Sequence, residues 1–184
     1  MIGSQKAVEF IKNNPGRFIY LAIRRTGYFF GLERRALTYF YSNNFFGYIP
    51  RAGLLIIAAL FCMPFVVVST SGVLGLALTR LGKETMLMLC FIIGYMAPHI
   101  FILAEDRFHL AILPFLAILT AYAWISGWLA LKKRGATRSG RVLILLAFVG
   151  IALLFLNWGL ELWRDAGKLA LLLGPNGNMA LFSY

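Results

Sequence analysis

The segment Glu105-Asp106-Arg107-Phe108-His109 concentrates the residue types that could do chemistry in this chain. It holds four ionisable side chains among five residues and lies between two long apolar stretches. If the segment is helical, Glu105 and His109 are i,i+4 neighbours and Asp106 and His109 are i,i+3 neighbours. The planar guanidinium of Arg107 suits a phosphate group. We therefore predict a phosphate-binding site in which Glu105 and Asp106 orient Arg107; the alternative is an ordinary polar turn in which the acids pair with Arg107.

Three more candidate phosphate ligands, Arg17, Arg24 and Arg25, lie in a segment near the N-terminus. Asn14 followed by Pro15 is typical of a helix start. The apolar residues that share one broad face of the predicted helix are Phe18, Leu21, Ala22, Tyr28, Phe29 and Leu32. A basic amphipathic helix rich in aromatic residues is expected to lie in the membrane interface. We therefore predict that residues 1–51 are interfacial, and that these three arginines and His109 contact lipid headgroups beside Arg107.

Histidine and cysteine within the apolar stretches give weaker signals. His99 is either a functional residue, as an ionisable group in a membrane often is, or a hydrogen-bonded packing residue. No cysteine or carboxylate stands at ligand spacing from it. Cys62 and Cys90 fall inside apolar runs, where cysteine usually behaves as a small hydrophobic residue. We predict no metal site and no cofactor.

The elements that must position these residues are membrane helices. Of the 184 residues, 60% are hydrophobic and 14% are charged, which is more apolar surface than a soluble domain of this size can bury. Four apolar stretches each have roughly the 17–25 residues that cross a bilayer: Leu54–Leu78, Met86–Ala104, Leu110–Leu131 and Val142–Leu160. They lack the alternation of barrel strands. The predicted fold is all-α integral membrane, with about four transmembrane helices at 52–161, basic amphipathic helices before them and a short interfacial tail at 162–184.

The net charge of +11 sits mostly between the apolar runs, which favours anionic lipid headgroups or lipid-linked phosphates over nucleic acid as partners. The loop at 132–141 has five basic residues and no acid, so the positive-inside rule places it in the cytoplasm. Arg80 and Lys83 must share its side, which gives seven basic residues there against eleven on the other side. We give the short loop more weight, because the N-terminal arginines belong to a helix with its own reason to be basic. Arg107 and the N-terminal segment are then expected to face outward.

Two motifs in this chain resemble a known family. The segment EDRFHLAILPFLAILTAYAW is similar to the R-Y/F-x-L-P-x-x-P-F-L signature of bacterial GT-C superfamily glycosyltransferases, the family 39-like enzymes related to protein mannosyltransferases and to the aminoarabinose transferase of lipid A. The matching residues are Arg107-Phe108-His109-Leu110 and Pro114-Phe115-Leu116, with Ala111 at a position that is small or proline in the signature. AVEFIKNNPGRFIYLAIRRTGYFF resembles an earlier helix of the same enzymes, with Asn14 where histidine is frequent. The resemblance spans roughly Lys6 to Leu160.

The resemblance implies transfer of a sugar from a polyprenyl-phosphate donor on the extracytoplasmic face of the bacterial inner membrane. It also implies that the loop carrying Arg107 faces the donor phosphate. The catalytic carboxylate of such enzymes lies in a first external loop, and no predicted span precedes Ala52 here. We therefore assign no catalytic residue and expect this chain alone to be inactive.

Two hypotheses follow for the function. In the first, the chain is the C-terminal transmembrane portion of such a glycosyltransferase, and the missing N-terminal half is supplied as a separate chain or was lost. In the second, it is a stand-alone four-helix accessory membrane protein that handles lipid-linked sugars or scaffolds a partner. A remnant without activity is a third possibility. Membrane lipids are partners in the first two cases.

Overall fold

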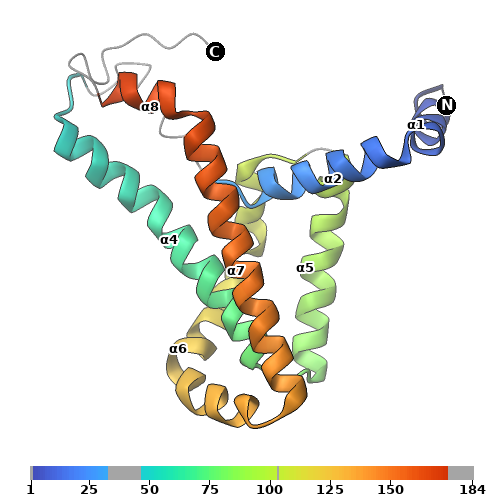
Figure 1. Cartoon of the computed structure of the whole chain (residues 1–184), viewed down its shortest axis with the longest axis vertical. Helices are drawn as coiled ribbons and strands as arrows, with labels where there is room; N and C mark the ends of the chain where they lie inside the picture. The colour runs from blue at the N-terminus through green and yellow to red at the C-terminus, as the bar shows by residue number, and fades with distance from the viewer. Residues whose placement is uncertain (1, 33–46, 103, 174–184) are drawn as a thin grey trace.

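The protein is built from helices, four of which are long and apolar enough to cross a membrane (Figure 1). A computed structural model describes residues 2–32, 47–102 and 104–173, apart from the side chains of residues 2–4 and Asp106. No strand occurs in these ranges. The helices are α1 (Ile2–Asn13), α2 (Pro15–Phe29), α4 (Arg51–Leu78), α5 (Lys83–Phe101), the 3₁₀ helix η1 (Asp106–Ile112), α6 (Leu113–Gly135), α7 (Arg138–Arg164) and α8 (Ala166–Leu172). The predicted fold, four spans preceded by shorter helices, is confirmed.

The helices extend beyond most ends of the apolar stretches that predicted them. α4 begins three residues before Leu54 and continues through Pro64, while α7 runs from Arg138 to Arg164 and so includes polar residues at both ends. The third span begins with η1, a tighter helix that leads directly into α6. These extensions have a simple cause, because backbone hydrogen bonding favours a continuous helix into the headgroup region even after the apolar residues end.

Helices α4, α6 and α7 form the packed unit of the membrane domain. Gly75 lets α4 approach α6 so closely that a Cβ there would overlap the backbone of Leu119. At the same contact, Thr120 of α6 donates a hydrogen bond to the Val68 carbonyl of α4 at 2.9 Å. Small residues at close approach and hydroxyl hydrogen bonds are the usual means by which helices associate in a bilayer.

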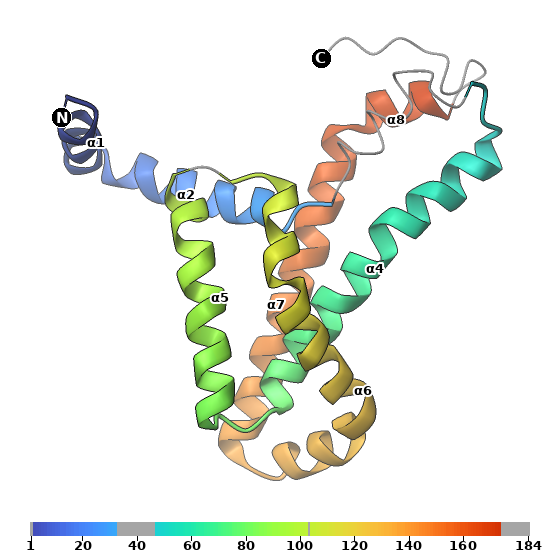
Figure 2. The same ribbon diagram turned by 180° about the vertical axis from the view of Figure 1, so that it is seen from behind.

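Helix α5 stands apart from that unit and is held mainly at one end. Its contacts are chiefly with α2 and η1, and Figure 2 shows α5 separated from α4 and α7 along most of its length. Helix α2 runs across this end of the bundle, and its Phe18 ring stacks on Phe101 at the end of α5, with ring centroids 5.7 Å apart. α2 is therefore the main contact of α5, beside η1 and a ring contact between Phe91 of α5 and Phe115 of α6.

The burial of α2 agrees with its predicted amphipathic face. All six apolar residues assigned to that face are buried or half-buried, whereas Arg17 and Arg24 are exposed. The helix begins at Pro15, as predicted, although the Asn14 side chain makes no capping hydrogen bond. Most of the loop between α2 and α4, expected to be interfacial, lies outside the described residues, as does the end of the predicted interfacial tail, residues 174–184.

The outer surfaces of the spans are apolar. Leu87 of α5, Ile125 and Leu129 of α6 and Leu145 of α7 are each more than half exposed. A surface of this kind is stable in hydrocarbon and not in water. The two basic loops, 79–83 and 132–141, lie together at the end opposite α2 (Figures 1 and 2), as the sequence predicted.

Replacing Gly75 with alanine tests the contact between α4 and α6. The added methyl group must displace the backbone at Leu119, so we expect the free energy of unfolding in detergent to fall by about 1–3 kcal/mol. Gly94→Ala is the matched control, because nothing lies within 4 Å of a Cβ at Gly94. Thermal denaturation followed by circular dichroism measures both variants. Equal melting temperatures for the two would contradict the close approach.

Candidate functional site

The C-terminal end of α2 is fixed to the bundle by side chains from α7. Asn157 donates from Nδ2 to the Gly27 carbonyl at 3.0 Å, and Trp158 donates from Nε1 to the Phe30 carbonyl at 2.8 Å. The Leu32 N–H donates to Glu161 Oε2 at 3.1 Å. The last carbonyls of any helix lack partners within the helix, so a helix end inside a membrane protein needs such side chains. We call these three bonds, together with the His109 contact described next, the α2 anchor.

His109 completes the α2 anchor from η1. Its ring is fully buried, stacks on Phe65 of α4 with centroids 3.7 Å apart, and places Nδ1 3.1 Å from the Phe29 carbonyl. A carbonyl oxygen only accepts, so this hydrogen bond requires the proton on Nδ1. The segment is 3₁₀ rather than α-helical, and Glu105 precedes it in an extended conformation. His109 therefore faces the protein interior, and in this structure its ring contacts α2 rather than the headgroup region predicted for it.

Arg107 is exposed, whereas His109 on the same short helix is buried. The Arg107 side chain is 70% exposed, and its Nε lies 2.8 Å from Glu105 Oε2. The guanidinium carbon lies 5.8 Å from the centroid of the Phe108 ring. One edge of the guanidinium is thus held by Glu105, and much of the side chain is accessible. Both readings of this segment, an arginine that Glu105 orients and an ordinary polar turn in which an acid pairs with Arg107, expect this ion pair. The Asp106 side chain lies outside the described residues.

The arginines of α2 divide into two kinds. Arg25 donates to the Phe101 carbonyl at 2.5 Å and so caps the end of α5. Arg24 donates from Nε to the Tyr28 hydroxyl at 2.7 Å, an interaction that raises the pKa of its guanidinium above the usual value. Arg17 is exposed and lies in the first turn of α2. Arg17 and Arg24 are open to headgroups, whereas Arg25 already has a structural contact.

His99 lies in an aromatic cluster beneath α2. Its ring centroid is 4.4 Å from that of Phe108, 4.8 Å from Tyr95 and 6.1 Å from Phe29. Of the two roles open to it from the sequence, this arrangement supports packing. The cluster joins α5 to η1 and α2, and its member Phe108 is the neighbour of Arg107 in the chain.

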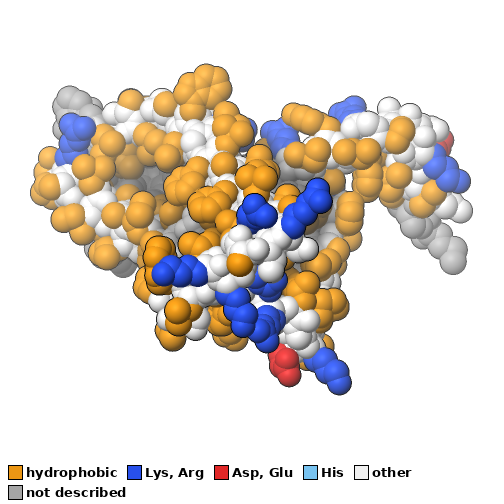
Figure 3. All heavy atoms as spheres, turned by 60° about the horizontal axis from the view of Figure 1, so that its bottom comes forward, with side chains coloured by type: hydrophobic (Ala, Val, Ile, Leu, Met, Phe, Trp, Pro, Cys, Tyr) orange, Lys and Arg blue, Asp and Glu red, His pale blue; other side chains and the backbone are white. Residues whose placement is uncertain are grey.

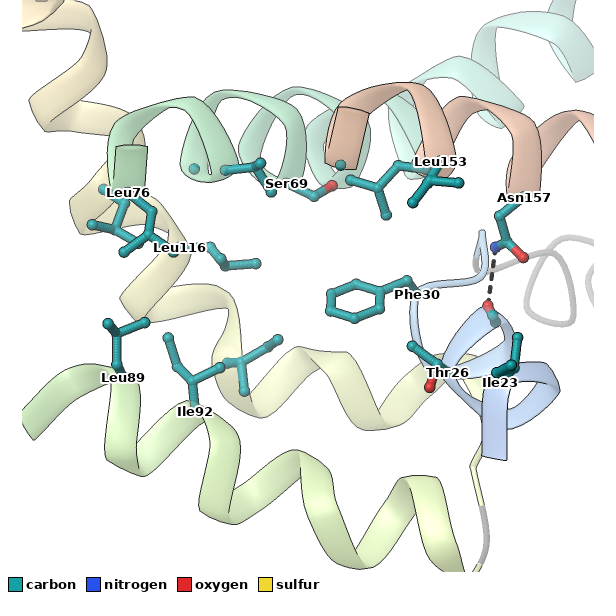
Figure 4. Close-up of a pocket in the computed structure, with 17 residues that line it drawn as sticks. Ile23, Thr26, Phe30, Ser69, Leu76, Leu89, Ile92, Leu116, Leu153 and Asn157 are labelled. Carbon is teal, nitrogen blue, oxygen red and sulfur yellow. Dashed lines mark hydrogen bonds between the residues drawn. The ribbon is translucent and has the colours of Figure 1, made fainter. Parts of the chain in front are cut away.

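A cavity of about 530 Å³ separates α5 from the α4–α6–α7 unit, under the end of α2. Figure 4 shows the Phe30 ring pointing into it, with Leu89 and Ile92 of α5 facing Ser69 of α4 and Leu153 of α7. Ile112 of η1 also lines it, so the cavity and Arg107 share one short helix. The volume is within the range of small-molecule sites.

The polar side chains in the cavity wall donate hydrogen bonds to backbone carbonyls of the protein. The Thr26 hydroxyl donates to the Ala22 carbonyl at 3.0 Å, the Ser69 hydroxyl donates to the Phe65 carbonyl, and Asn157 donates to Gly27 in the α2 anchor. The remaining lining residues are aliphatic, aromatic or glycine. A wall of this chemistry suits a hydrocarbon chain.

Comparison with models of known protein families finds no match, and neither curated proteins nor solved structures give a significant one. The architecture itself defines the class, which is a multi-pass helical membrane protein. Within the described ranges, no three histidine, cysteine, aspartate or glutamate residues lie close enough together to hold a metal ion.

The structure adds residues that the sequence did not single out. Trp158 lies inside the last predicted span and Glu161 just beyond its end, and neither was predicted to hold another helix. Both are buried, at 4% and 3% exposure, because α7 continues past them and α2 covers them. The sequence feature that could have identified Glu161 is a carboxylate among apolar residues at the end of a span. No feature of the sequence indicates that it accepts a hydrogen bond from Leu32.

Replacing Trp158 with phenylalanine tests the α2 anchor. The change keeps an aromatic ring but removes the donor to the Phe30 carbonyl, so we expect a loss of about 1–3 kcal/mol in stability and faster tryptic cleavage after Arg24 or Arg25. The same substitution at Trp163, which is 78% exposed, is the control. The anchor would be refuted if both variants were cleaved at the wild-type rate.

Proposed function

We propose that this chain is the transmembrane portion of a GT-C glycosyltransferase that uses a polyprenyl-phosphate sugar, and that it contributes the lipid-phosphate site. One observation supports this most strongly: an exposed arginine, oriented by a carboxylate, lies on the same short helix as the wall of an apolar cavity. A polyprenyl phosphate has a charged head and a hydrocarbon tail, and the two features match these two parts.

Arg107 supplies the head contact. A guanidinium binds phosphate through two parallel hydrogen bonds, and Glu105 engages Nε of Arg107 while much of the side chain stays accessible. Arg17 and Arg24 of α2 add positive potential at the same end of the bundle. The isoprene units of the lipid that lie nearest its phosphate enter the cavity beneath α2, where Phe30 and the aliphatic wall exclude water.

The proposed orientation places this end at the extracytoplasmic face of the bacterial inner membrane. The two basic loops at the opposite end are short and adjacent to the spans, which is where the positive-inside rule applies most directly. The sugar is then transferred outside the cytoplasm, from a donor held at the outer lipid boundary.

The catalytic base comes from another part of the enzyme. Sugar transfer needs a carboxylate that removes a proton from the acceptor, and no carboxylate here has been assigned that role. The proposal therefore includes additional polypeptide, either continuous with this chain or a separate subunit, that brings the carboxylate to the α2 end.

Arg107→Ala should weaken binding of polyprenyl phosphate by about 10- to 100-fold, because a hydrogen bond to a charged group is worth ~1.5–3 kcal/mol. Binding of the uncharged polyprenol of the same length should not change. The affinity of Arg107→Lys for polyprenyl phosphate should lie between those of the wild type and Arg107→Ala, since lysine keeps the charge but loses the planar pair of donors. Titrating each lipid into purified protein in micelles measures these affinities for the wild type and both variants. Arg164→Ala is the control. Wild-type affinity of Arg107→Ala for the phosphate would remove the proposed role.

Gly150→Leu tests the cavity separately from the head contact. Gly150 lines the cavity, and a Cβ there would lie 3.5 Å from Val73 of α4, which lines it too. A leucine should fill part of the cavity, so polyprenyl phosphate and polyprenol should both bind about tenfold more weakly. Gly159→Leu, on the same helix where nothing lies within 4 Å of a Cβ, should bind both normally. If Gly150→Leu bound both lipids as the wild type does, the tail would not occupy this cavity.

A further inference from the structure

A second charged surface lies at the end of the protein opposite α2 and takes no part in the proposed function. Its basic residues come from the two short loops and the adjoining helix ends: Arg80, Lys83, Lys132, Lys133, Arg134, Arg138 and Arg141. We call this set the basic platform. The only acid within residues 79–85 and 132–141 is Glu84, so seven positive charges meet one negative charge, a net of +6. Figure 3 shows lysine and arginine side chains gathered on this end.

The two loops of the platform are fixed to each other. Arg134 donates from Nη2 to the Thr79 carbonyl and from Nε to the Leu78 carbonyl at 3.4 Å, which caps the last turn of α4. One arginine at the end of α6 thus positions the loop that carries Arg80 and Lys83.

The corner between α6 and α7 is equally constrained. Thr137 caps α7 by accepting a hydrogen bond from the Gly140 N–H at 3.1 Å, and its own N–H donates to the Arg134 carbonyl. A Cβ at Gly140 would overlap that carbonyl. Charges on a constrained scaffold lose less entropy on binding a ligand than charges on a loose loop.

The platform lies at the lipid boundary. Lys132 Nζ is 5.1 Å from the centroid of the Trp128 ring, a pairing typical of a bilayer interface. Trp128, Ile125 and Leu81 are each more than 60% exposed, so apolar surface for lipid tails begins within two turns of the charges.

We propose that the basic platform binds the phosphodiester headgroups of anionic phospholipids in the leaflet opposite Arg107. Six of its seven basic side chains are exposed, whereas Arg134 is half-buried in its capping role. A membrane surface reaches these charges wherever the protein is inserted, and each lysine or arginine near an anionic surface adds roughly 1 kcal/mol of attraction. A soluble polyanion such as a nucleic acid has to compete with that headgroup layer, which makes the lipid the favoured partner.

Tryptophan quenching by brominated lipids measures this binding at the platform itself. In a Trp163→Phe background the exposed tryptophans are Trp124 and Trp128, both on the platform half of α6, while Trp158 is buried. The protein is reconstituted into phosphatidylcholine vesicles with 20% phosphatidylglycerol, and either lipid is brominated in turn. We expect brominated phosphatidylglycerol to quench about three- to fivefold more, per mole fraction, than brominated phosphatidylcholine at low salt, and the excess to fall at 0.5 M salt.

Two matched variants complete the experiment. Lys133→Gln/Arg138→Gln/Arg141→Gln removes three platform charges while leaving Lys132 and Arg134 in place, and it should abolish most of the excess quenching. Lys6→Gln/Lys12→Gln/Lys168→Gln removes three exposed charges at the other end and should leave it unchanged. Equal quenching by the two lipids in the starting protein, or an excess that survives the platform variant, would overturn the proposal. Neither result bears on polyprenyl-phosphate binding at Arg107.

Discussion

The α2 anchor is the interaction on which the arrangement of this protein depends. The carbonyls of Gly27, Phe29 and Phe30 and the N–H of Leu32 are backbone groups at a helix end, and each has a partner on α7 or η1. Buried without partners, each would cost free energy comparable to a lost hydrogen bond. The anchor therefore determines where α2 ends and how it crosses the bundle.

The position of α5 follows mainly from that of α2. α5 contacts the rest of the protein mainly through α2 and η1. One further ring contact, Phe91 of α5 on Phe115 of α6 with centroids 4.8 Å apart, holds it against the bundle. The space that remains between α5 and the α4–α6–α7 unit is the apolar cavity beneath Phe30. The same end carries Arg107, so a single set of contacts fixes the position of the charged group relative to the apolar space. An arrangement of this kind suits a ligand with a charged head and a long hydrocarbon tail.

The two ends of the molecule use arginine differently. At the α2 end, Arg107 is oriented by Glu105 and left accessible, while Arg25 caps α5. At the platform end, Arg134 caps α4 and the surrounding cations are exposed. In both places an arginine satisfies the terminal carbonyls of a span, which a lysine would do with fewer fixed donors. Sequence position alone does not separate the capping arginines from the accessible ones.

The sequence by itself determined the four spans, the amphipathic face of α2, its start at Pro15 and the common side of the two basic loops, because hydropathy, helical periodicity and helix connectivity are local properties of the chain. It also singled out Arg107 and Glu105, which are adjacent enough for their contact to be local. Only the tertiary structure decided that His109 faces inward, that Glu161 and Trp158 hold α2, and that a cavity separates α5 from its neighbours. The hydrogen bonds of His109, Trp158 and Glu161 join residues 80 to 129 positions apart, and no local pattern specifies which backbone group a distant side chain will reach.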